Sequence, residues 1–441
     1  MIYSVKSTAK EFEKIVRGSL EGKDCKIKGI SIDSREVGDA WCFIAIKGKN
    51  NNGHEYISQA VSNGACLIIA QEKVNTKIPV IYVSDTVKAL GLLAKFHKGK
   101  AKVIAVTGSV GKTTVKNMLI SVLSKHFSVC GTEKNHNNEI GVAQTLLSIK
   151  NEDYCVIEMG MRQRGQIDWL AYIAEPYIAI ITNCTDAHLE LLKSRENIFN
   201  AKMEILNYSP EYAFVPFENR FLEYKYTNTK VTFLGDGSDC FILNQENDGL
   251  HLTFQLNTGE CYLINSIFEC NAYNALFAHS VAKLLKVPYE KIVQGFSEFV
   301  NDDNREKTIK INNTVVINDC YNASYESMKS AIASCAKYAK CIDKKLYLLL
   351  GDMLELGEES GEFHKKIGEF ARKSGVRALY LVGKYAGCVA EGFGGKQAYF
   401  YDDSMIKDIL KETDNGVLLV KASRTLQLEK IIERLKQCKD D

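Results

Sequence analysis

The sequence contains no apolar run near the roughly 18 residues that a membrane-spanning helix needs. Its first ten residues also lack the hydrophobic stretch of a secretory signal. Neither sign of charge dominates, because 56 lysines and arginines oppose 54 aspartates and glutamates, which leaves a net charge of +2. We therefore expect a cytoplasmic protein that binds neither a membrane nor nucleic acid.

Closely paired cysteines and proline-rich linkers are missing as well. The 14 cysteines are scattered, and no two have the C-x-x-C spacing typical of zinc or redox sites. Only 5 prolines accompany 31 glycines, and no internal repeat or low-complexity tract is present. With 46% hydrophobic and 25% charged residues, the composition is that of a globular protein, which excludes disordered and collagen-like chains.

Length and element pattern together predict three α/β domains. At roughly 150 residues a domain, a chain of 441 residues corresponds to about three. Short mixed elements fill residues 1–99, and strands alternate with helices over 100–304, interrupted between 212 and 268 by a pattern typical of inserted hairpins. Residues 305–441 alternate again. We expect a small mixed α/β domain, a central P-loop ATPase-like parallel sheet carrying the hairpins, and a C-terminal Rossmann-like doubly wound domain.

A phosphate-binding loop is the clearest motif. An apolar run at 103–106 and a helical stretch flank the segment Thr107-Gly108-Ser109-Val110-Gly111-Lys112-Thr113-Thr114. Glycines let the backbone approach phosphate oxygens, Lys112 supplies positive charge, and the Thr113 hydroxyl can bind Mg²⁺. The strict six-position pattern would place glycine at Val106, so a glycine-rich turn with a surface lysine is the alternative. The loop indicates a nucleotide and leaves the reaction open.

Three further side chains are candidates for the chemistry. Glu158 ends a buried strand, so it should face the nucleotide crevice and could hold Mg²⁺, although a strand-end glutamate can also lie in solvent. His188 follows the strand that ends at Thr182, where it is a metal ligand or a structural histidine. Lys202 alone would be read as a solvated helix lysine.

The ordered series of motifs resembles the Mur ligase family over essentially the whole chain. Its segments are Ile32-Asp33-Ser34-Arg35, Gly53-His54, Gly108-Ser109-Val110-Gly111-Lys112-Thr113-Thr114, Asn137-Asn138-Glu139-Ile140-Gly141, Glu158-Met159-Gly160-Met161-Arg162, Ile181-Thr182-Asn183, Ala187-His188-Leu189-Glu190, Ala201-Lys202-Met203-Glu204-Ile205, Asn271 to Asn274, Asp319 to Asn322, Gly351-Asp352, Glu355 to Gly357, and Lys421 to Arg424.

The resemblance implies ATP-dependent joining of a carboxylate to an amine through an acyl phosphate, with ATP and Mg²⁺ as cofactors. It implies catalytic and metal roles for Lys112, Thr113, Glu158, His188 and Lys202, with Lys202 as a carbamate. It places the adenosine side at Asn271, Asn274, Arg305 and Asp319. It assigns substrate contacts to Asp33, Ser34, Arg35, Gly53, His54, Asn137, Asn138, Tyr321, Asn322, Lys421, Ser423 and Arg424. We expect the third domain to close over the second and exclude water from the acyl phosphate.

Several positions depart from the family pattern. Asn304 stands where glycine usually precedes Arg305, and Ser324-Tyr325 replaces Asn-Pro. Ala422 replaces a glycine, and His136 stands where an apolar residue is common. These departures concern the amine side more than the ATP and metal set.

Four interpretations of the function remain open. The pairing of the 351–357 and 319–323 segments favours an enzyme that adds D-alanyl-D-alanine to UDP-N-acetylmuramoyl-tripeptide, both small-molecule partners. We also expect a monomer. A sister ligase would add a single amino acid to a shorter muramyl peptide, or glutamate to folate. A P-loop kinase would need no amine, and a binding module without activity would have no reason to retain Lys112, Glu158, His188 and Lys202 together.

Overall fold

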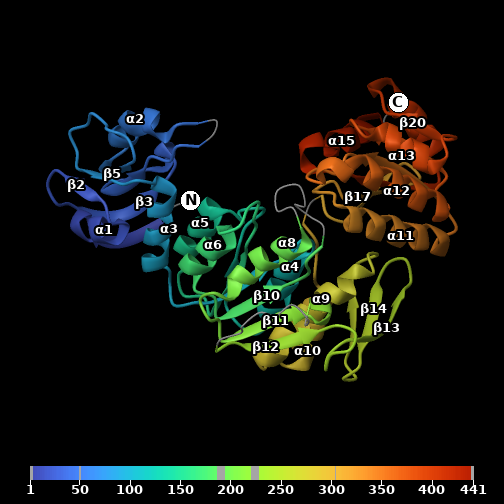
Figure 1. Ribbon diagram of the computed structural model, residues 1–441, viewed down its shortest axis with the longest axis horizontal. Helices are drawn as coiled ribbons and strands as arrows, with labels where there is room; N and C mark the ends of the chain where they lie inside the picture. The colour runs from blue at the N-terminus through green and yellow to red at the C-terminus, as the bar shows by residue number, and fades with distance from the viewer. Residues whose placement is uncertain (1–2, 49–50, 186–193, 220–227, 303, 439–441) are drawn as a thin grey trace.

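The computed structural model describes residues 3–48, 51–185, 194–219, 228–302 and 304–438. It contains three six-stranded sheets, one in each part of the chain, and a smaller three-stranded sheet. Figure 1 shows the N-terminal part in blue and the C-terminal part in orange and red on opposite sides of the central part. The expected α/β architecture with three sheet-centred parts is confirmed, and we propose the domain limits 1–99, 100–304 and 305–441.

The first sheet has the strand order β1-β3-β4-β5-β6-β2. Its four inner strands are parallel, and both edge strands run antiparallel to their neighbours. The elements are β1 (Tyr3–Thr8), α1 (Ala9–Val16), β2 (Ser19–Glu21), β3 (Lys26–Ser31), β4 (Trp41–Ile44), α2 (Ile57–Ser62), β5 (Ala65–Ala70), β6 (Val80–Tyr82) and α3 (Thr86–His97). Apolar runs such as β5 are typical of strands covered on both faces.

The central sheet is parallel throughout, with the order β12-β11-β10-β7-β9-β8. Its elements are β7 (Lys102–Thr107), α4 (Lys112–Leu123), β8 (Val129–Gly131), α5 (Glu139–Ser148), β9 (Tyr154–Glu158), α6 (Gln166–Ala174), β10 (Ile178–Ile181), α8 (Arg195–Met203), β11 (Tyr212–Pro216) and β12 (Lys230–Leu234). β7 lies in the middle, so the loop that follows it opens at the centre of the sheet edge.

Hairpins occupy a shorter stretch than the sequence predicted. β11 and β12 extend the parallel sheet, so the expectation of hairpins from residue 212 was wrong for the first two strands. The reason is visible in β11, whose last four residues are all buried, as in a strand covered on both faces. The antiparallel meander consists of β13 (Ile242–Asn247), β14 (Leu252–Leu256) and β15 (Cys261–Ile264), and α9 (Cys270–Leu284) and α10 (Tyr289–Ser297) follow it.

The third sheet has the order β16-β17-β21-β18-β19-β20, with β16 as its only antiparallel strand. Its elements are β16 (Lys307–Ile311), β17 (Thr314–Asn318), α11 (Tyr325–Cys341), β18 (Lys345–Gly351), α12 (Ser360–Lys373), β19 (Ala378–Val382), α13 (Ala386–Phe393), β20 (Ala398–Phe400), α14 (Ile406–Glu412), β21 (Gly416–Lys421) and α15 (Glu429–Gln437). Strands alternate with helices as a doubly wound domain requires.

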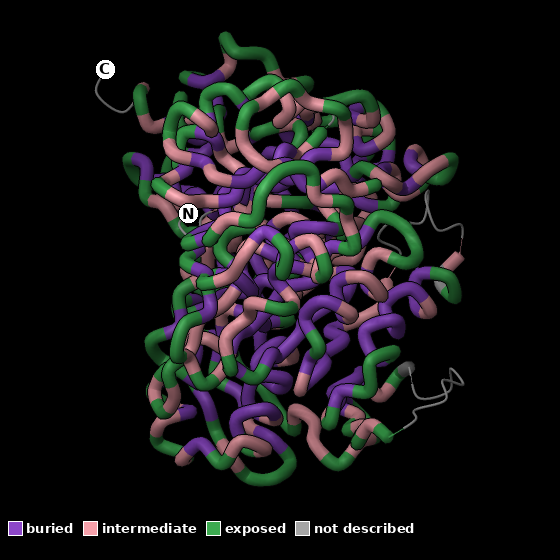
Figure 2. Tube along the Cα trace, turned by 90° about the vertical axis from the view of Figure 1, so that its left-hand side faces the viewer, coloured by how far each residue is buried: buried purple, intermediate pink, exposed green. Residues whose placement is uncertain are grey.

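Apolar side chains from both faces of β7 enter two separate cores. Val103 and Ala105 belong to a core that continues through α3 of the first part, whereas Ile104 and Val106 belong to a core beneath α4 and α9. Helix α3 packs against α5 and α6, where the Lys95 ammonium donates to the Tyr172 carbonyl at 2.9 Å. Figure 2 shows the buried residues continuing through the interior of the molecule.

Helices of the described segments are short or amphipathic. None of them is long and apolar enough to cross a membrane.

Candidate active site

The phosphate-binding loop connects β7 to α4 and requires glycine at two positions. Gly108 has φ +150°, and a Cβ atom there would lie 1.9 Å from the Thr182 hydroxyl oxygen. Gly111 has φ +82°, and a Cβ atom there would lie 2.5 Å from the Asn274 side-chain oxygen. Both conformations favour glycine, and both contacts leave no room for a side chain. The packing of the loop therefore explains why the motif has glycine at these two positions.

The end of the neighbouring strand β10 holds the loop in place. The Asn183 side-chain oxygen accepts hydrogen bonds from the backbone amides of Ser109 (3.1 Å) and Val110 (2.9 Å). The Thr182 hydroxyl donates to the Val110 carbonyl at 2.6 Å. The Ser109 hydroxyl donates to the carbonyl of Thr185 at 3.1 Å. The loop is thus preformed before any nucleotide arrives, with the first turn of α4 directed at the space above it.

Lys112 begins α4 and folds back over the loop. Its ammonium donates to the carbonyls of Gly108 (2.8 Å) and Ser109 (3.1 Å). Burial lowers the pKa of Lys112, while the carboxylate of Glu158 opposes that effect. The lysine therefore supplies a positive charge within the concave side of the loop, where phosphate oxygens would lie in a phosphate-binding loop.

A carboxylate and a hydroxyl meet beside the loop. Glu158 ends β9 with 2% of its surface exposed, and its Oε2 accepts a hydrogen bond from the Thr113 hydroxyl at 2.7 Å. Its Oε1 accepts from the Asn137 side chain at 2.8 Å, and its backbone amide donates to the Thr132 hydroxyl at 3.0 Å. Glu158 therefore lies at the end of its strand beside the first turn of α4, and its role toward a nucleotide stays a prediction.

This pair fits a magnesium ion. Hard oxygen donors, one anionic and one neutral, are what Mg²⁺ takes from protein when substrate phosphates complete its coordination. Among the described residues there is no group of three or more histidine, cysteine, aspartate or glutamate side chains that could bind a metal ion without such help. Thr114 is buried behind the same turn, and the Thr107 hydroxyl donates to the Met159 carbonyl at 3.0 Å.

Lys202 is not the solvated helix lysine that its spacing alone suggests. Lys202 lies near the C-terminus of α8 with 1% of its surface exposed. Its side chain is among the largest fully buried ones in the part of the chain that the structure describes. Burial, and then the charge of Lys112, lowers the pKa of Lys202 to about 7. A much larger fraction of the Lys202 amine is therefore neutral near pH 7 than of the amine of a surface lysine. The fourth predicted residue, His188, lies outside the described residues.

Two asparagines of α9 approach the loop from the other side. The Asn274 side-chain nitrogen donates to the Asn271 side-chain oxygen at 2.8 Å, and Asn274 in turn lies against Gly111. Both are buried. The side-chain nitrogen of Asn271 donates to Ser266 and Glu306, whereas the side-chain oxygen of Asn274 lies against Gly111, so Asn274 is the member of the pair that contacts the loop.

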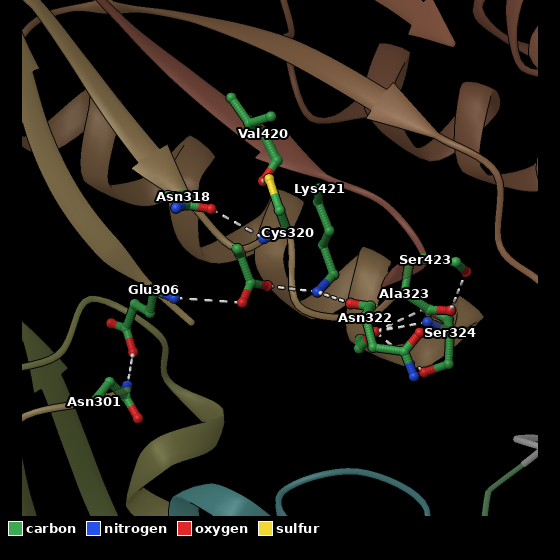
Figure 3. A network of polar contacts seen from close by, with 12 residues as sticks. Asn301, Glu306, Asn318, Cys320, Asn322, Ala323, Ser324, Val420, Lys421 and Ser423 are labelled. Atoms are coloured by element: carbon green, nitrogen blue, oxygen red, sulfur yellow. Dashed lines mark hydrogen bonds and ion pairs between the residues drawn. The ribbon is translucent and has the colours of Figure 1, made fainter. Parts of the chain in front are cut away.

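The third domain contributes a network of polar and charged residues around Lys421 (Figure 3), and a cation–aromatic pair. The guanidinium of Arg305 stacks on the Tyr321 ring at 3.9 Å. The positive charge of Arg305 helps to lower the pKa of Lys112, so Arg305 lies on the side of the third domain that faces the loop. The Lys421 ammonium pairs with Asp319 at 2.5 Å and donates to the Asn322 carbonyl at 3.0 Å. Lys421 therefore acts here as the counter-ion of Asp319.

The remaining third-domain residues support loops. The Ser423 hydroxyl accepts a hydrogen bond from the Leu354 amide at 3.0 Å, which joins the 351–357 segment to the end of β21. The Arg424 guanidinium pairs with Glu429 at 2.6 Å on the surface.

Asn138, by contrast, belongs to the central domain, where its side chain caps α5 by accepting a hydrogen bond from the Gly141 amide at 2.9 Å.

The first-domain residues are not gathered with the loop. Arg35 pairs with Asp33 at 2.6 Å, and this hydrogen-bonded pair lowers the pKa of Asp33 to about 2. Ser34 donates to the Gln59 side chain at 2.7 Å. These residues lie in the first domain, on the far side of the central sheet from the third domain (Figure 1).

His54 and Gly53 have structural contacts of their own. The two ring nitrogens of His54 contact the Asn52 side-chain oxygen (2.8 Å) and the Gln71 amide (3.2 Å), so the ring is held as a neutral tautomer. A Cβ atom at Gly53 would lie 2.7 Å from the backbone of Ile46. This segment is a tightly packed turn.

Sequence reasoning missed Lys116 and Glu306. Lys116 follows Lys112 by one helical turn, and its buried ammonium donates to the Thr132 carbonyl at 2.8 Å, behind Glu158. The i, i+4 spacing from Lys112 could have indicated it. Glu306 offers no comparable signal, because all its partners are distant in the sequence or belong to loops.

Together, a phosphate loop, a buried carboxylate beside it and a buried lysine of lowered pKa on three α/β domains define an ATP-using enzyme of the P-loop type. Comparison with known proteins makes the class specific. Models of the Mur ligase middle domain, the glutamate ligase domain and the Mur ligase catalytic domain match residues 106–282, 304–437 and 26–105. The chain belongs to the Mur ligase family.

Individual relatives match over nearly the full length. The UDP-N-acetylmuramoyl-tripeptide–D-alanyl-D-alanine ligase of Bacillus subtilis is 32% identical and that of Escherichia coli 30%, each match covering 98% of both chains. A crystal structure of MurF from Acinetobacter baumannii superposes with a TM-score of 0.89 at 29% identity, covering 99% of this chain and 100% of that one. The MurF ligase of Thermotoga maritima in complex with ADP gives 0.84 at 28% identity, covering 93% and 97%.

Proposed function

We infer that the chain is an ATP-dependent ligase that joins D-alanyl-D-alanine to UDP-N-acetylmuramoyl-tripeptide and releases ADP and phosphate. This is an amide-forming step of peptidoglycan precursor synthesis. The observation that carries the inference is the full-length similarity to enzymes named for this reaction, at 30–32% identity. The preformed phosphate loop beside Glu158 and Lys202 supplies the machinery that such a reaction needs.

The chemistry follows from the weakness of a carboxylate as an electrophile. The acid is first activated by taking the γ-phosphoryl group of ATP, and the resulting acyl phosphate is then attacked by the amine, with phosphate as the leaving group. Both steps collect negative charge in one place. Lys112 and the first-turn amides of α4 lie where they can stabilise that charge.

Two Mg²⁺ ions fit this proposal. Thr113 and Glu158 would hold one beside the ATP phosphates, and His188 with Lys202 as its carbamate would hold the other. A bound Mg²⁺ neutralises charge that develops on the transferring phosphoryl oxygens. Lys202 meets the first requirement of a carbamate, because its lowered pKa leaves a large fraction of neutral amine near pH 7.

The three domains suit three ligands. We propose that the first domain binds the uridine nucleotide-sugar at Asp33, Ser34, Arg35 and the 53–54 turn, that the central domain binds ATP, and that the third binds the dipeptide. Arg305 and Tyr321 stack at the edge of the third domain that faces the phosphate loop. Closure of that domain would exclude water from the acyl phosphate. We also propose that the enzyme works as a monomer in the cytoplasm.

One assay tests the proposed function. Purified protein is given ATP, Mg²⁺, UDP-N-acetylmuramoyl-tripeptide and a panel of amines, and phosphate release is followed. We expect release that depends on both the tripeptide and D-alanyl-D-alanine, with the Lys112→Met variant inactive as the matched control. Release that depends on a single amino acid would indicate a sister ligase, and release without any amine would indicate a kinase or an ATPase.

A further inference from the structure

The turn after β15 and the start of α9, together residues 266–271, contact the third domain and attach it to the central one. Ile267 and Phe268 insert into the core beneath α11 of the third domain. Glu269 pairs with Lys337 of α11 at 2.5 Å, and its backbone amide donates to the Ser334 hydroxyl at 3.3 Å. We name residues 266–271 the attachment turn.

A single carboxylate of the third domain, that of Glu306, binds the attachment turn. Oε1 of Glu306 accepts hydrogen bonds from the Ser266 hydroxyl (2.7 Å) and from the amides of Ile267 (2.5 Å) and Phe268 (2.9 Å). Oε2 accepts from the side-chain amides of Asn271 (2.7 Å) and Asn301 (3.1 Å). Five donors surround two oxygens, and only an ionised carboxylate can accept from all of them.

Glu306 is also fixed from the third-domain side. Its backbone amide donates to Asp319 at 3.3 Å, and Asp319 pairs with Lys421 at the end of β21 (Figure 3). Its φ of +52° lies in the left-handed region, which is unusual for a residue with a side chain and persists only where the surroundings enforce it. The position of the carboxylate is therefore set by the sheet of the third domain.

A chain of contacts leads from this carboxylate to the phosphate loop. Asn271, held by Glu306 and by the Ser266 hydroxyl at 2.9 Å, accepts at its side-chain oxygen from the Asn274 side chain at 2.8 Å. The Asn274 oxygen is thereby directed at Gly111. Each side-chain amide in this series of contacts is oriented by the next one. Rotating the Asn271 amide group by half a turn would place its nitrogen against the nitrogen of Asn274, and two donors would then face each other.

We propose that Glu306 is a positioning residue for nucleotide binding, which orients Asn274 against the phosphate loop through Asn271 and ties that orientation to the attachment of the third domain. The proposal rests on the proposed function only in that the loop takes ATP. Burial raises the pKa of Glu306 to about 7, and its hydrogen-bond donors oppose this, so the carboxylate is ionised in the conditions of a ligase assay at pH 8.

The test compares Glu306→Gln with Glu412→Gln. Glutamine keeps the size of the side chain but replaces one acceptor oxygen with a donor, which opposes the donors already there. Glu412 is a matched control, since its carboxylate accepts from the Tyr380 hydroxyl at 2.6 Å within the third domain, away from the attachment turn. ADP affinity is measured by calorimetry, and KM for ATP and kcat by phosphate release at pH 8.

We expect Glu306→Gln to weaken ADP binding at least tenfold and to raise KM for ATP similarly, with a smaller change in kcat, while Glu412→Gln stays within twofold of the parent protein. A merely structural role would lower the melting temperature and leave the ADP affinity of the folded protein unchanged. ADP affinity within twofold of the parent would overturn the proposal.

A second variant covers the case in which Glu306→Gln does not fold. Asn271→Ala interrupts the chain of contacts and leaves the bonds from Glu306 to the amides of Ile267 and Phe268. It should weaken ADP binding to a similar extent, and an unchanged affinity would refute the relay. Where both variants fold, the double variant should bind ADP no more weakly than the worse single one, because the two residues act in series. ADP binding by the parent protein without dipeptide-dependent turnover would reject the proposed function and leave this test valid.

Discussion

Carbamylation of Lys202 can be tested by removing the amine or the carbon dioxide that would modify it. At the ordinary lysine pKa of about 10.4, only roughly 4 in 10⁴ amines are neutral at pH 7. Burial and the charge of Lys112 lower the pKa of Lys202 to about 7, which raises the neutral fraction to about one half. The concentration of the reactive amine is therefore on the order of 10³-fold higher than for a surface lysine.

Two measurements follow. Protein equilibrated with ¹³C-bicarbonate should show one carbamate carbonyl resonance that is absent from Lys202→Ala, and turnover should fall at least tenfold in buffer depleted of carbon dioxide and return on its readdition. Lys202→Ala should lose at least 99% of turnover and regain part of it with formate or acetate, which can replace the missing carboxylate.

Lys116→Ala is the matched control for the label. Its ammonium is also buried, but it donates to the Thr132 carbonyl at 2.8 Å, so we expect the labelled resonance to persist in that variant. The reasoning would be refuted by a protein that turns over at the full rate without carbon dioxide, or by a Lys202→Ala variant that remains active.

Four further predictions concern the site and the folded state. Glu158→Gln should raise the Mg²⁺ concentration for half-maximal turnover about tenfold, since a carboxylate ligand is lost; an unchanged requirement would place the ligand elsewhere. Gly108→Ala should weaken ADP binding at least tenfold in calorimetry, because its Cβ would lie 1.9 Å from a β10 hydroxyl, and unchanged binding would contradict the loop geometry. Lys421→Met should lower the free energy of unfolding in urea by about 3 kcal/mol by leaving Asp319 unpaired, whereas a loss below about 1 kcal/mol would show that Asp319 reaches solvent. Burial lowers the pKa of His279 to about 4, so the unfolded chain binds more protons between pH 4 and 6.5, and the free energy of unfolding should fall by about 2 kcal/mol from pH 7 to 5; His279→Gln should lack that part of the pH dependence, and an identical slope would count against it.

Local patterns were sufficient for the loop and for the strand-end carboxylate. The loop is contiguous, and Glu158 could be placed because a parallel strand directs its carboxyl end at the crevice. Lys202 is different, since its burial depends on how α8 packs, and nothing in its neighbourhood in the sequence distinguishes it from a surface lysine. Family resemblance, and not spacing, identified it.

Long-range pairs explain what sequence reasoning could not supply. The hydrogen bonds that Asn183 accepts from the loop amides span more than 70 residues, and the Lys421–Asp319 pair spans 102. Neither leaves a periodic trace in the sequence. The boundary of the hairpins was misplaced for a related reason, because short strands such as β11 and β12 are assigned to a sheet by their neighbours in space.

The apolar layer shared by α3 and the central sheet has a consequence for inhibitor chemistry. Leu90 and Leu93 of α3 lie in one continuous core with Val142 and Leu146 of α5, and Lys98 donates to the Ala174 carbonyl at 2.9 Å across the same seam. The first domain and the central sheet therefore share one packed core, and we expect this core to fix the span from the 33–35 segment to the phosphate loop. On the proposal that the 33–35 segment binds the uridine nucleotide, we expect a rigid spacer of matching length that links a uridine mimic to a phosphate mimic to bind both sites with little loss of conformational entropy.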